Sequence, residues 1–217
     1  MNNMSIEQLI NEALRPKEKR PINSWHPSAL GSCLTGAYLN RLGVEPDKEL
    51  DERVLRIFSV GKQFEDWLVN LIKESGATIE TQKRIEWPEM DVTGYVDLII
   101  DEMPVEIKTK HSKSFWYMTK QGAPRQNQMQ LWVYLKVLNV KVGRLVFLSK
   151  DDLAVQEYPV YLEDEQLANE VINELTILNR AWEEKLPPPP IEDPKDWRYK
   201  FCRFHLQCLN FNTYLQI

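Results

Sequence analysis

The chain has 217 residues, of which 43% are hydrophobic, and its 27 basic and 32 acidic side chains leave a formal net charge of −5. This composition allows one domain with a buried core, and it excludes a protein that coats nucleic acid through an overall basic excess. No apolar run approaches the roughly 20 residues of a membrane span, and the first residues lack the basic and apolar regions of a signal peptide, so we expect a cytoplasmic protein with no membrane partner.

The N-terminal third is predicted to be mainly helical. A short helix over residues 5–14 begins at a Ser5 cap, and a charged linker follows it. Residues 25–43 are predicted to form a second helix that begins near Ser28 and contains Cys33. A long helical stretch over residues 47–75 is interrupted at Gly61, and Glu65 lies one turn further on.

Residues 78–87 are predicted to form a strand, and residues 93–110 form two more strands around a four-residue turn at 101–104. In that register Asp97 pairs with Lys108, and Ile99 pairs with Glu106, which places Asp97, Glu106 and Lys108 on one face. Two carboxylates and an ammonium fit a Mg²⁺ or Mn²⁺ site that activates water and offsets charge on a phosphorane-like transition state. The alternative is a solvated face with a cross-strand ion pair.

The segment 105–125 concentrates positive charge, with five basic residues against a single acidic one, and it includes three consecutive aromatic residues. Basic residues interleaved with aromatic ones suit a DNA strand held by phosphate contacts and base stacking. A solvated loop with one aromatic anchor in the core is the alternative. The candidate DNA-binding residues are Lys110, Lys113, Trp116, Lys120 and Arg125.

The last third contains two helices and a pair of strands. The first helix, over residues 126–140, places Gln130 and Tyr134 on one face. Strands follow over 143–149 and 155–160, and a long helix over 163–185 ends before four consecutive prolines. We divide the chain into an N-terminal helix and linker (1–24), a core (25–186) and a C-terminal segment (187–217) that packs back on the Cys33 helix.

The candidate residues form four motifs along the chain: Gly61 to Glu65, Gly94-x-x-Asp97, Glu106-x-Lys108 and Gln130-x-x-x-Tyr134. Their order and approximate spacing resemble the RecB-like nucleases of the PD-(D/E)XK superfamily. That group includes the RecB and AddB nuclease domains, the CRISPR-adaptation nucleases and phage-type exonucleases. The resemblance covers about residues 25–208 and implies an α/β fold, a restriction-endonuclease-like core whose central mixed sheet is flanked by helices, with helical N- and C-terminal segments.

The resemblance also implies roles for individual residues. One or two Mg²⁺ or Mn²⁺ ions would be held by Glu65, Asp97, Glu106 and the carbonyl of Ile107. Lys108 would be catalytic, and the active site would be completed by Gln130 and Tyr134.

A metal-dependent exonuclease acting on a free DNA end is the implied activity, in recombination, repair or phage DNA processing. The setting would be a bacterium or a phage-infected host cell, with recombination or replication proteins as partners. The alternatives are a single-strand or structure-specific endonuclease, a catalytically silent DNA-binding subunit, and a module that does not bind nucleic acid.

The three cysteines are an odd number and widely spaced, which argues against a secreted disulfide framework. The resemblance implies a [4Fe–4S] cluster with one cysteine before the core and three after it, spaced Cys-x-x-Cys-x₅-Cys. Cys33 fits the first position and Cys202 and Cys208 the last two, but Tyr199 occupies the remaining one. With His205 as a fourth ligand the set would also suit zinc. We expect an iron–sulfur cluster, and the alternatives are an empty site and zinc.

Overall fold

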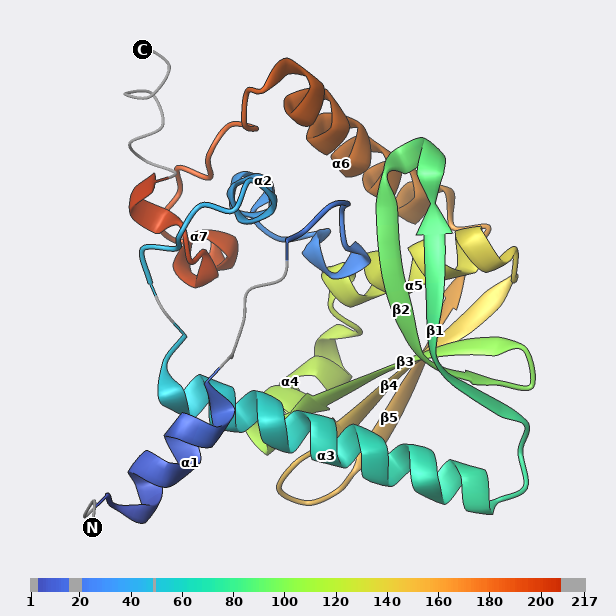
Figure 1. Cartoon of the computed structure of the whole chain (residues 1–217). Coiled ribbons are helices and arrows are strands. Elements are labelled where there is room, and N and C mark those ends of the chain that lie inside the picture. The colour runs from blue at the N-terminus through green and yellow to red at the C-terminus, as the bar shows by residue number, and fades with distance from the viewer. Residues whose placement is uncertain (1–3, 16–20, 49, 208–217) are drawn as a thin grey trace.

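The structure, a computed structural model, describes residues 4–15, 21–48 and 50–207. A five-stranded sheet in the order β1-β2-β3-β4-β5 runs through it (Figure 1). Neighbouring strands are antiparallel except β3 and β4, which are parallel. The predicted α/β class with a central mixed sheet is confirmed. The strands are β1 (Ile79–Trp87), β2 (Val92–Ile100), β3 (Met103–Lys110), β4 (Val142–Ser149) and β5 (Val155–Tyr161).

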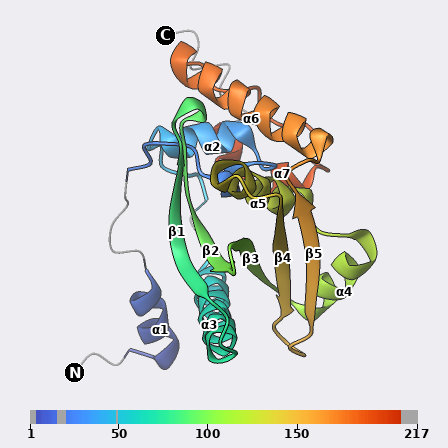
Figure 2. The ribbon, with the colours of Figure 1, turned by 90° about the vertical axis from the view of Figure 1, so that its right-hand side faces the viewer.

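The parallel pair explains the two helices between β3 and β4. A strand that continues parallel to its predecessor needs a crossover connection of a dozen or more residues. Here the crossover contains α4 (Ser112–Gln121) and α5 (Arg125–Leu138). α5 covers one face of the sheet and carries α6 (Glu165–Glu184) on its other side, whereas α3 (Glu52–Glu74) lies against the opposite face (Figures 1 and 2).

Two clusters of apolar side chains hold these layers together. The larger lies between the sheet, α5, α6 and α2 (Leu34–Arg41), and the smaller joins the other face of the sheet to α3. Ile107 belongs to the smaller cluster, and alternate residues of a strand point to opposite faces. Glu106 and Lys108 therefore face α5, and their register partners on β4 are Leu145 and Phe147.

The predicted register of the β2–β3 hairpin is wrong by two residues. Leu98 pairs with Val105 and Ile100 with Met103, so the turn contains only Asp101 and Glu102, both with positive φ. A two-residue turn with left-handed backbone matches the twist of a hairpin, but it is usually signalled by Asn-Gly or Asp-Gly. A shift of two residues preserves the face on which each side chain lies, so the predicted grouping is kept.

The helices differ from expectation in their boundaries. Helix α1 (Ile6–Leu14) begins at Ser5 as predicted, with a capping box to Gln8. Cys33 lies outside the helix that was expected to contain it. It is the N-cap of α2 and accepts the backbone N–H of Gly36, whereas Ser28 belongs to a short 3₁₀ turn, η1 (Pro27–Ala29). The predicted interruption at Gly61 is also wrong, because α3 continues through it.

The structure adds three short elements: η2 (Pro88–Met90) between β1 and β2, α4, and α7 (Trp197–Phe201). After α6 the proline run returns to α2, where Thr35 Oγ1 donates to the carbonyls of Pro188 and Pro189, each at 3.0 Å.

The division at residues 24 and 186 stays a prediction, and residues 16–20 of the expected linker lie outside the described ranges. Within those ranges no helix has the length and apolar character that a membrane crossing requires.

Candidate active site

The candidate site begins where β2 and β3 part. β2 pairs with β1 along its length except at Asp97, but it pairs with β3 only through its last three residues, so the β1–β2 hairpin turns away from the other strands (Figure 1). Asp97 is the first β2 residue beyond these pairs, and its Oδ2 accepts the backbone N–H of Ile107 at 3.0 Å. The carboxylate therefore replaces a backbone acceptor and is fixed at the opening between the strands.

Glu106 of β3 is completely buried beside this opening. Its Oε1 accepts a hydrogen bond from Gln130 Nε2 at 2.7 Å and pairs with the Lys108 ammonium. Its second oxygen, Oε2, is buried and has no hydrogen-bond partner within the described ranges. A buried carboxylate oxygen without a partner costs free energy, which makes this atom a natural ligand for a cation.

The charges at the site perturb one another. Burial raises the pKa of Glu106 to about 8; the Lys108 charge opposes this effect, and the charges of Asp97 and Glu65 add to it. Burial disfavours the ammonium of Lys108, but the neighbouring carboxylates outweigh it and raise the pKa of that group. A divalent cation beside the carboxylates would favour their ionised forms.

Gln130 and Tyr134 come from one face of α5, as predicted, and both are buried. Gln130 Nε2 donates to Tyr134 Oη at 3.0 Å as well as to Glu106. Burial and the Glu106 charge raise the pKa of the Tyr134 phenol, so the phenol stays protonated. A Cβ at Gly94 would lie 2.9 Å from Pro27 Cδ and 3.2 Å from Tyr134 Cε1, which explains the glycine of the Gly94-x-x-Asp97 motif.

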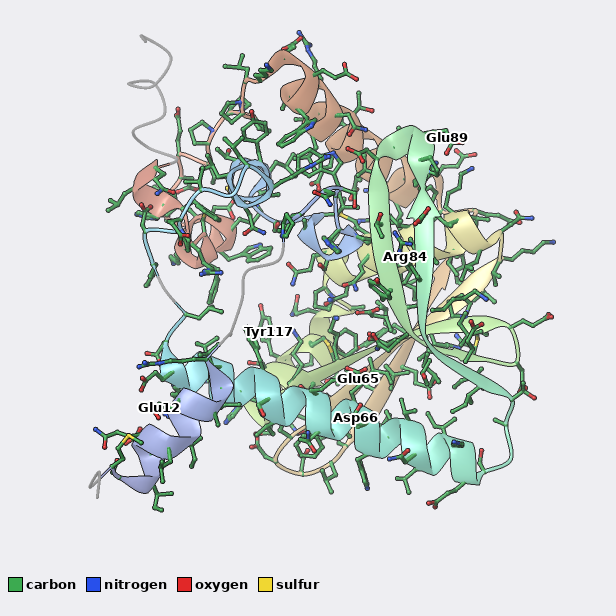
Figure 3. All side chains as sticks on the ribbon, in the orientation of Figure 1. Glu12, Glu65, Asp66, Arg84, Glu89 and Tyr117 are labelled. Carbon is green, nitrogen blue, oxygen red and sulfur yellow. The ribbon has the colours of Figure 1, made fainter. Side chains whose placement is uncertain are left out.

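Glu65 reaches the site from α3. Its carboxylate pairs with Lys62 at 2.7 Å and accepts Gln82 Nε2 of β1 at 3.2 Å. Burial raises its pKa, and the nearby Asp97 charge contributes. Figure 3 shows Glu65 on the side of α3 that faces the sheet. A Cβ at Gly61 would lie 3.1 Å from Thr109 Oγ1, so the glycine allows α3 to approach the end of β3.

The donor set fits a hard divalent cation. Glu65, Asp97 and Glu106 offer carboxylate oxygens, which suit Mg²⁺ or Mn²⁺. The orphaned Oε2 of Glu106 provides an available lone pair in the buried part of the site. Across residues 4–15, 21–48 and 50–207, no three Asp, Glu, His or Cys side chains already stand close enough together to hold a metal ion. The carbonyl of Ile107 stays a predicted ligand.

The predicted DNA-binding residues fall into two groups. Lys110, Lys113, Trp116 and Lys120 line a cavity of about 800 Å³ beside α4. Arg125 lies outside this cavity and binds Glu170 of α6 through two hydrogen bonds of 2.7 and 3.0 Å.

The cysteine region is partly visible. Cys33 and Cys202 line one cavity of about 360 Å³, and a Cβ at Gly36 between them would lie 3.1 Å from Cys202 Sγ and 3.7 Å from Cys33 Sγ. The His205 ring packs against Tyr199 with centroids 4.1 Å apart. The structure therefore brings together two of the predicted ligands and places His205 on the tyrosine. Cys208 lies outside the described residues.

Sequence reasoning missed two residues near the site. Gln82 bonds Glu65 although its φ of 51° interrupts the extended backbone of β1, and no sequence pattern signals this conformation. Tyr117 of α4 is 67% exposed and lines the lysine-rich cavity. Helical spacing from Lys113 and Lys120 would have singled it out, had residues 112–121 been recognised as a helix.

Comparison with known proteins identifies the fold. No family model matches the chain, and no curated protein matches it in sequence. Among solved structures, SSO0001 is 19% identical, with a TM-score of 0.59 over 94% of this chain and 96% of that chain.

The alkaline exonuclease LHK-Exo from Laribacter hongkongensis is 15% identical, with a TM-score of 0.57 over 75% of this chain and 89% of that chain. LHK-Exo in complex with dAMP is 14% identical, with a TM-score of 0.57 over 90% of this chain and 95% of that chain. The chain thus has the α/β fold of an alkaline exonuclease, the restriction-endonuclease-like fold that its motifs predict.

Proposed function

We propose that the chain is a RecB-like, metal-dependent deoxyribonuclease that hydrolyses phosphodiester bonds from a free DNA end. The observation that carries this proposal is the buried Glu106, whose Oε2 lacks a partner in the described ranges, beside Lys108 and near Asp97, where two strands separate. The fold shared with an alkaline exonuclease supports the same reaction class.

Several side chains have separate roles in the proposed hydrolysis. Lys108, held by Glu106, orients the attacking water and offsets negative charge on the phosphoryl oxygens. Gln130 fixes Glu106 through Oε1, which leaves Oε2 available, and Tyr134 fixes the Gln130 amide in turn. The water oxygen bonds to phosphorus and releases a proton to solvent, the bond from phosphorus to the leaving oxygen breaks, and that oxygen takes up a proton from solvent.

The carboxylates of Glu65, Asp97 and Glu106 would hold Mg²⁺ or Mn²⁺. The bound cation lowers the pKa of water and stabilises charge on the transition state. Asp97 is already fixed by the Ile107 N–H, and Glu65 by Lys62 and Gln82. Both carboxylates therefore lose little further freedom when a cation binds.

The test is digestion of end-labelled linear DNA and closed circular DNA, single- and double-stranded, with Mg²⁺, Mn²⁺ or EDTA. We expect metal-dependent loss of linear DNA with circles spared. Lys108→Ala and Asp97→Ala should each lower the rate by about 100-fold or more, because each removes transition-state stabilisation. Lys136→Ala is the matched control, since that lysine is exposed on α5.

Each other result points to a different activity. Cutting of circles would replace the exonuclease by an endonuclease. DNA binding without cleavage under any metal would favour the silent subunit. Full activity of Lys108→Ala would refute the proposed active site. If the protein neither cleaved DNA nor bound it in a salt-dependent way, it would be a module that does not bind nucleic acid.

A further inference from the structure

The cavity beside α4 and the candidate active site share strand β3. Lys110 follows Lys108 on the same face of β3, about 7 Å further along the strand, and lines the cavity. Lys113 and Lys120 extend the lining along α4, about 10 Å apart. A chain of phosphates that leaves the carboxylates would therefore meet one lysine after another.

The lining is positive in a protein that is negative overall. Among the described residues, no aspartate or glutamate lines this cavity of about 800 Å³. Within the ranges that the structure describes, Lys110, Lys113 and Lys120 form no ion pair, so their charges are available to a ligand. Unpaired lysines around a cavity without carboxylates favour a polyanionic ligand.

The aromatic residues of α4 have different roles. Phe115 is buried, and Trp116 is tied to the β4–β5 turn, because its indole N–H donates to Asp152 Oδ2 at 3.0 Å. Tyr117 is 67% exposed and lines the cavity, and its hydroxyl makes no hydrogen bond within the described chain. Figure 3 shows it projecting from α4 away from the strands. Tyr117, whose hydroxyl is not tied to another element, is therefore placed to stack on a ligand, next to the predicted Trp116, which lines the same cavity and is 51% exposed.

We propose that the cavity beside α4 holds an unpaired DNA strand next to the scissile phosphate, with Tyr117 stacked on a base and Lys110, Lys113 and Lys120 on phosphates. This inference rests on the proposed nuclease function and adds the substrate class. A ring that projects from a helix can stack on an exposed base, but the bases of a duplex already stack on one another. The cavity also has the volume of a small-ligand site, which suits a few nucleotides.

The test measures binding without cleavage. Fluorescence anisotropy in EDTA would compare a labelled single-stranded oligonucleotide with the same sequence as a duplex. We expect Tyr117→Ala to weaken single-strand binding about 10-fold or more and duplex binding far less, and Tyr117→Phe to restore it. Tyr161→Ala, which removes a 56% exposed tyrosine from β5, is the matched control.

A second measurement follows the lysines. Replacing Lys113 and Lys120 by Gln should reduce the slope of log affinity against log salt by about 1.4, or about 0.7 for each phosphate that a lysine no longer neutralises. The control pair is Lys136→Gln with Lys141→Gln, both exposed and outside the cavity. All of these positions are at the surface, so we expect each variant to fold, and a change in the salt dependence of DNA affinity reports on the lost charge.

Three outcomes would overturn the inference. Unchanged single-strand affinity of Tyr117→Ala would exclude the stacking role, and equal losses on single strands and duplex would exclude the preference for an unpaired strand. Binding is measured without metal, so failure of cleavage alone refutes the nuclease and leaves this result standing. Cleavage that does not depend on Tyr117 refutes the inference and leaves the nuclease standing.

Discussion

Glu106 is the residue whose complete burial is most at odds with its ionisable side chain. A fully buried carboxylate is costly unless it is paired, and here one oxygen is bound by Gln130 and Lys108 while the other has no partner in the described ranges. An apolar residue of similar size would be buried in the larger cluster of apolar side chains at a lower cost in free energy. Retention of a carboxylate at this position is consistent with a site that is completed by a cation.

The raised pKa makes a test possible on the metal-free protein. In the folded state Glu106 holds its proton up to about pH 8, against an ordinary pKa of 4.5. Its contribution to stability is therefore fully present below pH 4.5 and is lost as pH rises through about 8. We expect Glu106→Gln to flatten this dependence and to exceed the parent in stability above pH 8.

Denaturant unfolding in EDTA across this pH range would measure the effect. Glu163→Gln, at an exposed position, is the control. A parent protein whose stability does not fall between these pH values would contradict the assignment of a neutral, buried Glu106.

At the scale of elements, α5 links the site to the rest of the helical layer. Its face carries Gln130 and Tyr134 toward the sheet, and its first residue, Arg125, binds Glu170 of α6 through two hydrogen bonds. The sequence predicts a DNA contact for Arg125. The structure shows a partly exposed ion pair that joins two helices, and the DNA contact stays a prediction.

A single substitution separates these roles. We expect Arg125→Ala to lower the free energy of unfolding by about 0.5–1 kcal/mol, as the loss of a partly exposed ion pair does, and to leave single-strand affinity unchanged. Thermal unfolding and oligonucleotide binding would be measured together, with Glu170→Gln as the partner variant. A several-fold loss of DNA affinity in Arg125→Ala alone would return this residue to the DNA-binding set.

Some elements were predictable from local pattern and others were not. Regular apolar spacing predicts α6, and alternation predicts the strands, because one face of each packs on a core. The sequence of α4 has no such apolar stripe, because only Phe115 and Met118 are buried. Its pattern therefore indicates a basic segment and does not predict a helix. The β2–β3 register was missed because Asp101 and Glu102 adopt left-handed backbone without the usual glycine.

The candidate site was predictable only in part. Alternation alone groups Asp97 with Glu106 and Lys108, and helical spacing joins Gln130 to Tyr134. That α5 lies over β3 is a tertiary fact, so the resemblance to a nuclease family was needed to bring Gln130 to Glu106. The pairing of Glu65 with Gln82 follows from an irregular backbone that no periodicity predicts.

In the whole molecule, residues near the two ends of the chain lie together. Thr35 of α2 binds the proline run, and Cys33 and Cys202 line the same cavity although they are far apart in sequence. A bound cluster or metal there would join the N- and C-terminal segments and add its binding free energy to folding.

Elemental analysis of protein purified without oxygen would decide what this cavity holds. We expect iron with visible charge-transfer absorption, and we expect Cys33→Ser and Cys202→Ser to lose both and to unfold at lower temperature. Lys108→Ala should keep its iron. Zinc in place of iron would favour the three-cysteine, one-histidine set with His205, and absence of both metals would indicate an empty site.

Among the described residues, the outer edges of β1 and β5 pair with no further strand of the sheet. An unprotected edge strand offers unpaired backbone groups to other chains and promotes aggregation. At one edge, β5 carries Pro159 near its middle, which has no N–H to offer, with the exposed Glu157 close by. At the other, Gln82 breaks the extended backbone of β1 and charged residues flank it. Both edges are thus unsuited to accept a further strand, and the irregularity that orients Glu65 also protects the sheet against self-association.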